Sequence, residues 1–294
     1  MTELSRKGVS FKSTLTLGRQ QLFFNPSEIV PYLVGLSENK ISRFLSTTYD
    51  RGPAEPFLEL LGAEKVTSMD FSDYEGATIQ HDLNRSIDSS LHERFDVVID
   101  GGTLEHVFNF PTAIRNAMEM VRVGGSLLIF TPANNQLGHG FYQFSPELFY
   151  NVLSATNGYQ VKEMVAIELS PAHCHYKVAD PSELQERVTL TNSWPVSLFV
   201  HAERTKKLPL FNETPQQTDY QSAWVAKEGT LVKSQSDTLT QLQRRGISKK
   251  AQIRNFLISS APSLLAHVTT FRQVFLNRSS GFKNSRFFKE RSSL

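Results

Sequence analysis

The sequence predicts an α/β protein built on a mostly parallel sheet. Apolar runs of strand length alternate with segments of helical spacing, which is the chain order of a parallel sheet covered by helices. The run Phe95–Asp100 is apolar between two acids, as in a strand buried on both faces. Ser126–Thr131 is a second buried run of the same kind.

Five elements are expected before Phe95. A short β-prone run is broken by Gly18, and a helix opens at Pro26, where a proline costs little in the first turn. A second helix stops at Gly62, and the strand after it ends on an acid, Asp70. With a short strand after these, the expected ranges are Lys12–Leu17, Pro26–Leu36, Pro53–Leu61, Val66–Asp70 and Thr78–Leu83.

The rest of the sheet is expected to end in an antiparallel pair. Pro111–Val123 has apolar residues on one helical face, and Gly124-Gly125 is expected to end that helix. A further helix opens at Ser145 and runs through Leu153. The last two strands, Gln160–Leu169 and Val196–Glu203, have no clear helix between them, which favours an antiparallel arrangement.

Composition excludes several classes of protein. The 294 residues are 39% hydrophobic, enough for a sizeable core. Cys174 is the only cysteine, so no intrachain disulfide and no multi-cysteine zinc site can form. His173 and His175 flank it, but no third ligand is evident, and no metal site is predicted. With no long apolar run, we expect a cytoplasmic protein.

Charge divides the chain. Residues 231–294 hold 12 Lys and Arg against 2 Asp and Glu, a net charge of +10, which leaves −8 for residues 1–230. We expect an N-terminal segment (1–12), an α/β domain (13–206) with an insertion near 21–52, a linker (207–235) and a basic tail (236–294), helical or partly disordered.

Basic and aromatic residues alternate in the tail. This pattern suits peripheral attachment to an anionic membrane surface, and a solvated charged tail is the open alternative. Nucleic-acid binding is disfavoured because no recognition motif accompanies the charge. The sequence does not predict an oligomeric state.

One stretch carries a family resemblance. Phe95–Asp100 leads into Leu104-Glu105-His106-Val107, and a Gly-Gly pair precedes the next strand. Over residues 13–206 the chain resembles the class I S-adenosylmethionine-dependent methyltransferases, in particular the type 11 branch. The resemblance implies a Rossmann-like, mostly parallel seven-stranded sheet with an antiparallel edge pair, and S-adenosylmethionine as cofactor.

The resemblance and the strand ends name the same cofactor residues. Ligands of open α/β sheets lie beyond the carboxyl ends of the strands. Asp70 is therefore expected to accept hydrogen bonds from the ribose hydroxyls, and Asp82-Leu83 to contact the adenine. The alternative for Asp70 is a helix cap or turn residue.

The first glycine motif of the family is reduced here to one glycine. Gly18 is expected to lie against the cofactor, with Arg19 contacting its carboxylate. Asp100 with Gly101 and Gly102 is expected to allow close backbone approach after the fourth strand.

Acceptor residues are expected after the fifth strand. Asn134, Asn135, Tyr142 and Gln143 lie in an amide-rich, aromatic segment that suits a polyhydroxylated or planar acceptor. His139 is a candidate general base, with His106 as its competitor. In the alternative interpretation, His139 is a loop residue and Glu105-His106 is architectural.

The sequence thus favours a methyltransferase acting on an oxygen or nitrogen of a small-molecule or glycan-related acceptor. A methyltransferase-shaped scaffold that binds a partner without catalysis stays open because of the reduced glycine motif. A dinucleotide-dependent oxidoreductase is disfavoured, since Gly-x-Gly-x-x-Gly is absent.

Overall fold

The computed structural model describes residues 1–22, 26–47, 52–171, 174–184, 187–220, 282 and 284–290. The chain divides into two compact units. The first comprises Met1–Val178, Trp194–Pro215 and Glu290–Leu294, and the second comprises Ala179–Ser193 and Gln216–Lys289. The first unit contains the strands that position the candidate site. Most of the basic tail lies outside the described residues, so its expected helical or disordered state and its membrane contact stay predictions.

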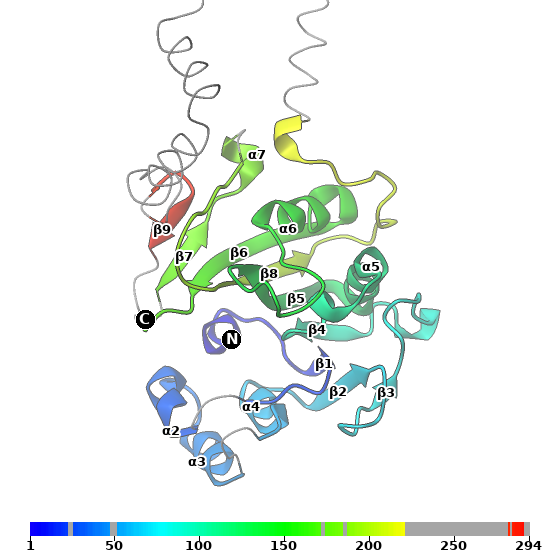
Figure 1. Cartoon of the computed structure of the whole chain (residues 1–294). Helices are drawn as coiled ribbons and strands as arrows, with labels where there is room; N and C mark the ends of the chain where they lie inside the picture. Colours follow the sequence, from blue (N-terminus) through cyan, green and yellow to red (C-terminus); the bar gives the residue numbers. More distant parts are fainter. Residues whose placement is uncertain are drawn as a thin grey trace, which may run out of the picture. The chain divides into compact units, whose positions relative to one another are not determined.

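One mixed sheet organises the fold (Figure 1). Its strands are β1 (Ser13–Leu17), β2 (Lys65–Asp70), β3 (Ile79–Gln80), β4 (Phe95–Asp100), β5 (Val121–Asn134), β6 (Tyr159–Glu168), β7 (His175–Val178), β8 (Val196–Arg204) and β9 (Phe288–Glu290). The order across the sheet is β3-β2-β1-β4-β5-β8-β6-β7-β9. The first five strands are parallel to one another. Their order, β3-β2-β1-β4-β5, is that of the first five strands of a doubly wound sheet. The expected α/β class is therefore confirmed.

The far side of the sheet is antiparallel. β8 pairs antiparallel with both β5 and β6, and β7 pairs antiparallel with β6. The expected antiparallel pair is confirmed, but the expected count of seven strands is wrong, because the sheet has nine. The two additional strands, β7 and β9, are short and mostly exposed, so they lack the buried apolar run that marks the others. β9 also lies beyond the expected end of the domain at residue 206.

The Gly-Gly pair does not end a helix. The helix α5 (Phe110–Met120) stops earlier, because Val121 already pairs with Phe95 in the sheet. The register then shifts between Phe95 and Val97, so the pair forms a bulge inside β5. A Cβ at Gly125 would lie 2.7 Å from the carbonyl oxygen of Asp96, so glycine is required there.

Helices cover both faces of the sheet (Figure 1). The helices in the described residues are α1 (Thr2–Arg6), α2 (Pro26–Ile29), α3 (Glu38–Thr47), α4 (Glu55–Leu60), α5, α6 (Pro146–Val152) and α7 (Pro181–Leu184), with 3₁₀ turns at Val30–Leu33, Ser89–Leu91, Leu104–His106 and Ala155–Asn157. α1 and α4 lie on one face, and α5 and α6 lie on the other. No helix in the described ranges is long and apolar enough to cross a membrane.

The N-terminal segment and the expected insertion both contribute to the core. Leu4 of α1 and Phe44 of α3 are buried in one cluster with Val97 of β4. The helix expected over Pro26–Leu36 is instead α2 followed by a 3₁₀ turn, since Pro31 interrupts α-helical hydrogen bonding. The core therefore extends to residues before the expected domain boundary at 13.

Candidate active site at the carboxyl edge of the sheet

Three strands end together at one edge. Leu17, the last residue of β1, is in register with Met69 of β2 on one side and Asp100 of β4 on the other. Gly18 therefore follows directly between two acids, Asp70 and Asp100. Three of the residues expected to contact the cofactor are thus brought together, as parallel strands require.

Gly18 is packed closely at this edge. Its N–H donates to the carbonyl oxygen of Met69 at 2.7 Å. A Cβ on Gly18 would lie 3.0 Å from Thr103 Oγ1 and 3.9 Å from Asp70 Oδ2. Thr103 in turn donates its hydroxyl to the carbonyl oxygen of Leu17 at 2.9 Å. The turns after β1 and β4 are therefore joined directly.

Asp100 is a buried carboxyl group with one free oxygen. Its side chain is 1% exposed, and Oδ1 accepts from the backbone N–H groups of Thr103 (2.9 Å) and Leu104 (3.3 Å). Oδ2 is buried and has no hydrogen-bond partner within the described part of the chain. Burial, and then the negative charge of Glu105, raise the pKa of Asp100 to about 7.

A cavity of about 400 Å³ opens beside Asp100. Its polar end is formed by Thr16, Gln20, Asp100 and Gly101. The remainder is lined mainly by apolar side chains of α4 and of the neighbouring strands β4, β5, β8 and β6. They include Phe57, Leu128, Phe130, Val165 and Phe199. An apolar cavity with a few polar groups at one end is the usual form of a small-molecule site.

Arg19 contacts acidic and carbonyl groups of the protein itself. Its Nε lies 2.8 Å from Glu55 Oε1, and its Nη1 donates to the carbonyl oxygen of Glu75 at 2.8 Å. Gln20, the next residue, turns back over Gly101. Its Nε2 donates to the carbonyl oxygen of Leu17 at 2.5 Å.

Asp70 forms a turn at the end of β2. Its Oδ1 accepts from the N–H of Phe71 at 2.6 Å, which leaves Oδ2 on the side of Gly18. No helix is present over residues 71–78, all of which are described, so Asp70 is not a helix cap. The aromatic side chains of Phe71 and Tyr74 are 76% and 92% exposed.

Asp82 lies two residues beyond the end of β3. β3 ends at Gln80, so the expected strand Thr78–Leu83 is shorter and Asp82 does not end it. Asp82 Oδ1 accepts from the backbone N–H (3.0 Å) and side-chain amide (2.8 Å) of Asn84, which lowers the pKa of Asp82. Leu83 is buried, and its carbonyl oxygen accepts from Asn116 at 3.3 Å.

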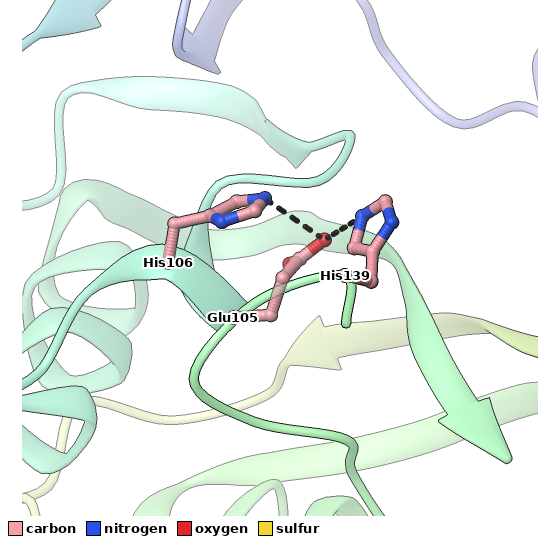
Figure 2. Close-up of side chains that lie close together, drawn as sticks. All are labelled: Glu105, His106 and His139. Carbon is pink, nitrogen blue, oxygen red and sulfur yellow. Dashed lines mark ion pairs between the residues drawn. The ribbon is translucent and has the colours of Figure 1, made fainter. Parts of the chain in front are cut away.

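Figure 2 shows a carboxylate between two imidazoles. Glu105 Oε1 lies 3.4 Å from His139 Nε2 and 4.0 Å from His106 Nε2. The Glu105 side chain is fully buried, whereas the imidazoles are each about half exposed. Sequence reasoning treated the histidines as competing bases, although the structure places both on one glutamate. In the chain, 32 residues lie between the two histidines, so the order of residues does not reveal this arrangement.

The segment after β5 is held against Glu105. The backbone N–H groups of Phe141 and Tyr142 donate to the carbonyl oxygen of Glu105 at 2.9 and 3.2 Å. A Cβ at Gly140 would lie 2.9 Å from that oxygen, so only glycine permits this approach. The position of His139 therefore depends on the main chain at Glu105.

The expected acceptor residues mainly stabilise this segment. The Asn135 side chain donates to the carbonyl oxygen of Trp194 (3.0 Å), and the Tyr142 hydroxyl donates to that of Phe108 (2.7 Å). Gln143 Oε1 accepts from the N–H of Gln136 at 2.8 Å. Asn134 is the last residue of β5 and is half-buried. His173 of the His173-Cys174-His175 cluster lies outside the described residues.

The chain is similar to solved structures of other proteins. No family model and no curated protein matches the chain. Among solved structures, a protein from Listeria monocytogenes assigned as an S-adenosylmethionine-dependent methyltransferase is similar, with a TM-score of 0.37 and 14% identity over 69% of this chain and 97% of that one.

Two further structures were solved with bound ligands. One is the Burkholderia thailandensis 1,6-didemethyltoxoflavin-N1-methyltransferase with its toxoflavin precursor and S-adenosylhomocysteine (TM-score 0.36, 11% identity, 70% of this chain and 76% of that one). The other is a branched-chain polyamine synthase from Thermus thermophilus with 5'-methylthioadenosine (TM-score 0.35, 12% identity, 72% and 56%). Similarity at this level assigns no activity, so the functional argument rests on this chain's own side chains.

Proposed function

We propose that the protein transfers a methyl group from S-adenosylmethionine to an oxygen or nitrogen of a small-molecule or glycan-related acceptor. One observation carries the proposal. Gly18 lies between Asp70 and Asp100 at one sheet edge, and Asp100 presents a buried oxygen that has no partner among the described groups. The cofactor carries ribose hydroxyls in its nucleoside part and an ammonium in its amino-acid part, so two acids at neighbouring strand ends suit it.

The nucleoside half of the cofactor suits the β2 side. Asp70 Oδ2 is available to accept from ribose hydroxyls, since Oδ1 is used by Phe71. The exposed ring of Phe71 offers a surface for stacking. Asp82 and Leu83 stay the proposed adenine contacts. Asp82 Oδ1 is engaged by Asn84 and Oδ2 lies 3.5 Å from Arg85 Nε, so Oδ2 would accept from the adenine beside this exposed ion pair.

The amino-acid half suits the β4 side. Asp100 Oδ2 would accept a hydrogen bond from the cofactor ammonium, which would pair a buried carboxylate that is otherwise costly to ionise. Gly101 and Gly102 offer backbone without a side chain at that point. Gln20 lies over Gly101 and would have to turn away, and Arg19 would have to leave Glu55 to reach a carboxylate.

The acceptor is proposed to lie beside the histidines. The cofactor supplies an electrophilic methyl group on a sulfonium. His139, or His106, would accept the proton that the acceptor hydroxyl or amine loses. The exposed rings of Phe108 and Phe141 are in edge contact, with centroids 6.0 Å apart, and form a surface for a planar acceptor. Asn134 and the amides nearby would orient it.

A scaffold without catalysis is the second candidate. The position of Gln20 favours it, because this side chain closes the approach to Gly101. In that case the protein would bind a partner through the same exposed aromatic segment and would not need the cofactor.

Calorimetric titration with S-adenosylhomocysteine separates the two candidates. The wild-type protein is expected to bind it, and Asp70→Ala is expected to lower affinity by about 1–3 kcal/mol, the scale of lost hydrogen bonds to a charged group. Asp73→Ala is the matched control, since Asp73 is an exposed acid three residues away. The absence of binding to the wild-type protein would favour the scaffold.

A further inference from the structure

We propose that Glu105, His106 and His139 bind one divalent transition-metal ion. The three side chains come from the turn after β4 and the segment after β5, and their ligand atoms all lie within 4.8 Å of one another (Figure 2). Carboxylate with two imidazoles is a ligand set used by zinc and by other first-row metals. The sequence predicts no metal site, so this site emerges only from the structure.

The separations suit a shared ion. Tetrahedral bonds of about 2.0–2.1 Å place neighbouring ligand atoms about 3.3 Å apart. Glu105 Oε1 and His139 Nε2 already lie 3.4 Å apart, and His106 Nε2 lies 4.0 Å from the same oxygen. Rotation of the two half-exposed imidazoles about their side-chain torsions would bring these atoms closer, as binding of one ion requires.

Glu105 supplies the strongest evidence for a ligand. Its side chain is fully buried, and Oε1 makes no hydrogen bond within the described residues. Leaving a buried carboxylate oxygen without a donor is unfavourable. Oε1 points to the space between the two imidazoles, as Figure 2 shows, so a cation there would compensate for the missing hydrogen bond.

The surrounding contacts orient these ligands. Thr131 donates its hydroxyl to Glu105 Oε2 at 3.2 Å, which fixes the carboxylate plane and directs Oε1 outward. The segment carrying His139 is held by the two backbone hydrogen bonds to the Glu105 carbonyl. Outer contacts of this kind are typical of metal sites, where they hold ligand orientation before the ion binds.

The ligand set favours particular metals. Two nitrogens and one carboxylate suit Zn²⁺, Co²⁺, Mn²⁺ or Fe²⁺, whereas Ca²⁺ and Mg²⁺ prefer oxygen ligands. Three protein ligands leave at least one position open, and the exposed side of both imidazoles faces outward. An open position is what distinguishes a reactive metal site from a closed structural one.

The histidine nitrogens that bind the ion are no longer proton acceptors, so the ion would hold the acceptor and lower the pKa of its hydroxyl, and the proton would leave to solvent water. An acceptor hydroxyl could occupy the open position, next to the Phe108–Phe141 surface. This role rests on the proposed function, but metal binding itself does not, because none of the three ligands is among the residues proposed to contact the cofactor. Failure of either proposal is therefore distinguishable from failure of the other.

The test is titration of the untagged full-length protein with Co²⁺ and Zn²⁺. Calorimetry is expected to show one ion per chain, and Co²⁺ is expected to give d–d absorption bands of a nitrogen-and-oxygen site. His106→Ala and His139→Ala, both at half-exposed positions, should each lose more than the roughly 10–100-fold in affinity that an outer contact contributes. Thr131→Val should lose an amount within that range.

His92→Ala is the matched control. His92 is also half-exposed, and its Nε2 lies 3.5 Å from the carboxylate of Glu119. The variant therefore tests whether a single histidine–acid pair is sufficient to bind the metal ion. The control should bind Co²⁺ as the wild type does. Unchanged affinity in both His106→Ala and His139→Ala, or no binding to the wild type, would overturn the proposal. S-adenosylhomocysteine titrated into the same variants should bind normally.

Discussion

The side chain of Gln20 occupies the space that a side chain at Gly101 would need. Its amide nitrogen donates to the carbonyl oxygen of Leu17 at 2.5 Å, and its amide oxygen overlaps the position of a Cβ on Gly101. One residue thus connects the ends of β1 and β4. Any ligand that approaches the Gly101 backbone must displace this amide first.

Gln20→Ala is expected to tighten binding of S-adenosylhomocysteine. The variant has no hydrogen bond to break before the ligand enters, and such a bond contributes about 1 kcal/mol. Calorimetry on the variant and on Gln80→Ala, an exposed glutamine of β3, measures the difference. Weaker binding in Gln20→Ala would instead show that this side chain contacts the ligand.

Asp100→Asn is expected to stabilise the fold near neutral pH and to weaken ligand binding. Asp100 has a pKa of about 7 in the folded protein, above its ordinary value, so folding is coupled to proton uptake. Its contribution to the free energy of unfolding is therefore greatest below pH 4 and declines as pH rises to about 7. Asparagine removes the cost of a buried charge, which the rise in pKa from 3.8 to about 7 puts at roughly 4 kcal/mol at pH 7.5.

Chemical denaturation of Asp100→Asn between pH 5 and pH 8 checks this. The difference in unfolding free energy from wild type should grow with pH. Asp73→Asn, an exposed substitution, serves as the control and should show no such trend. A constant difference across the range would show that Asp100 does not titrate there.

His201→Gln is expected to act in the opposite direction. Burial lowers the pKa of His201 to about 4, and its Nε2 lies 3.1 Å from Ser126 Oγ. The unfolded chain then binds a proton that the folded protein does not, so stability is lost as pH falls from about 6.5 to 4. Glutamine should remove that loss, which thermal unfolding at pH 5 and at pH 7.5 would reveal. An equally acid-sensitive variant would exclude His201 as the cause.

Arg204→Met is expected to destabilise the protein by about 2–3 kcal/mol, the scale of hydrogen bonds from a buried charge. Arg204 is 3% exposed, and its guanidinium donates to the carbonyl oxygens of Glu119 (3.2 Å) and Val121 (2.6 Å), where α5 passes into β5. Arg122→Met is the control, because the Arg122 side chain is 45% exposed and its ion pair with Asp96 should contribute less than the buried hydrogen bonds of Arg204. Urea denaturation compares them, and equal losses would contradict the argument.

Buried strands were predictable from sequence, and exposed ones were not. β4 has the predicted bounds because Phe95–Asp100 is a buried apolar run between two acids. β7 was missed because only one of its four residues is buried, so no periodicity marks it. Gly124-Gly125 was expected to end the helix, but β5 pairs with β4 on both sides of these two glycines, and this pairing overrode the local preference.

The site was predictable only where strand ends define it. Asp70 and Asp100 lie at the edge because the strands that carry them are parallel neighbours of β1. The pairing of Glu105 with His139 could not be derived, since it depends on how the segment after β5 folds back onto the Glu105 carbonyl. Hydrogen bonds between distant main-chain groups leave no trace in the order of residues.

The position of β8 determines when the parallel and antiparallel parts of the sheet can join during synthesis. β6 precedes β8 in the chain, yet β8 separates it from β5. A nascent chain that has emerged only as far as β6 therefore has an open edge on β5 and cannot join β6 to it in the final register. Residues 196–204 form β8 and must emerge before the five parallel strands can join the β6–β7 pair. Both parts of the sheet therefore depend on the same late segment of the chain.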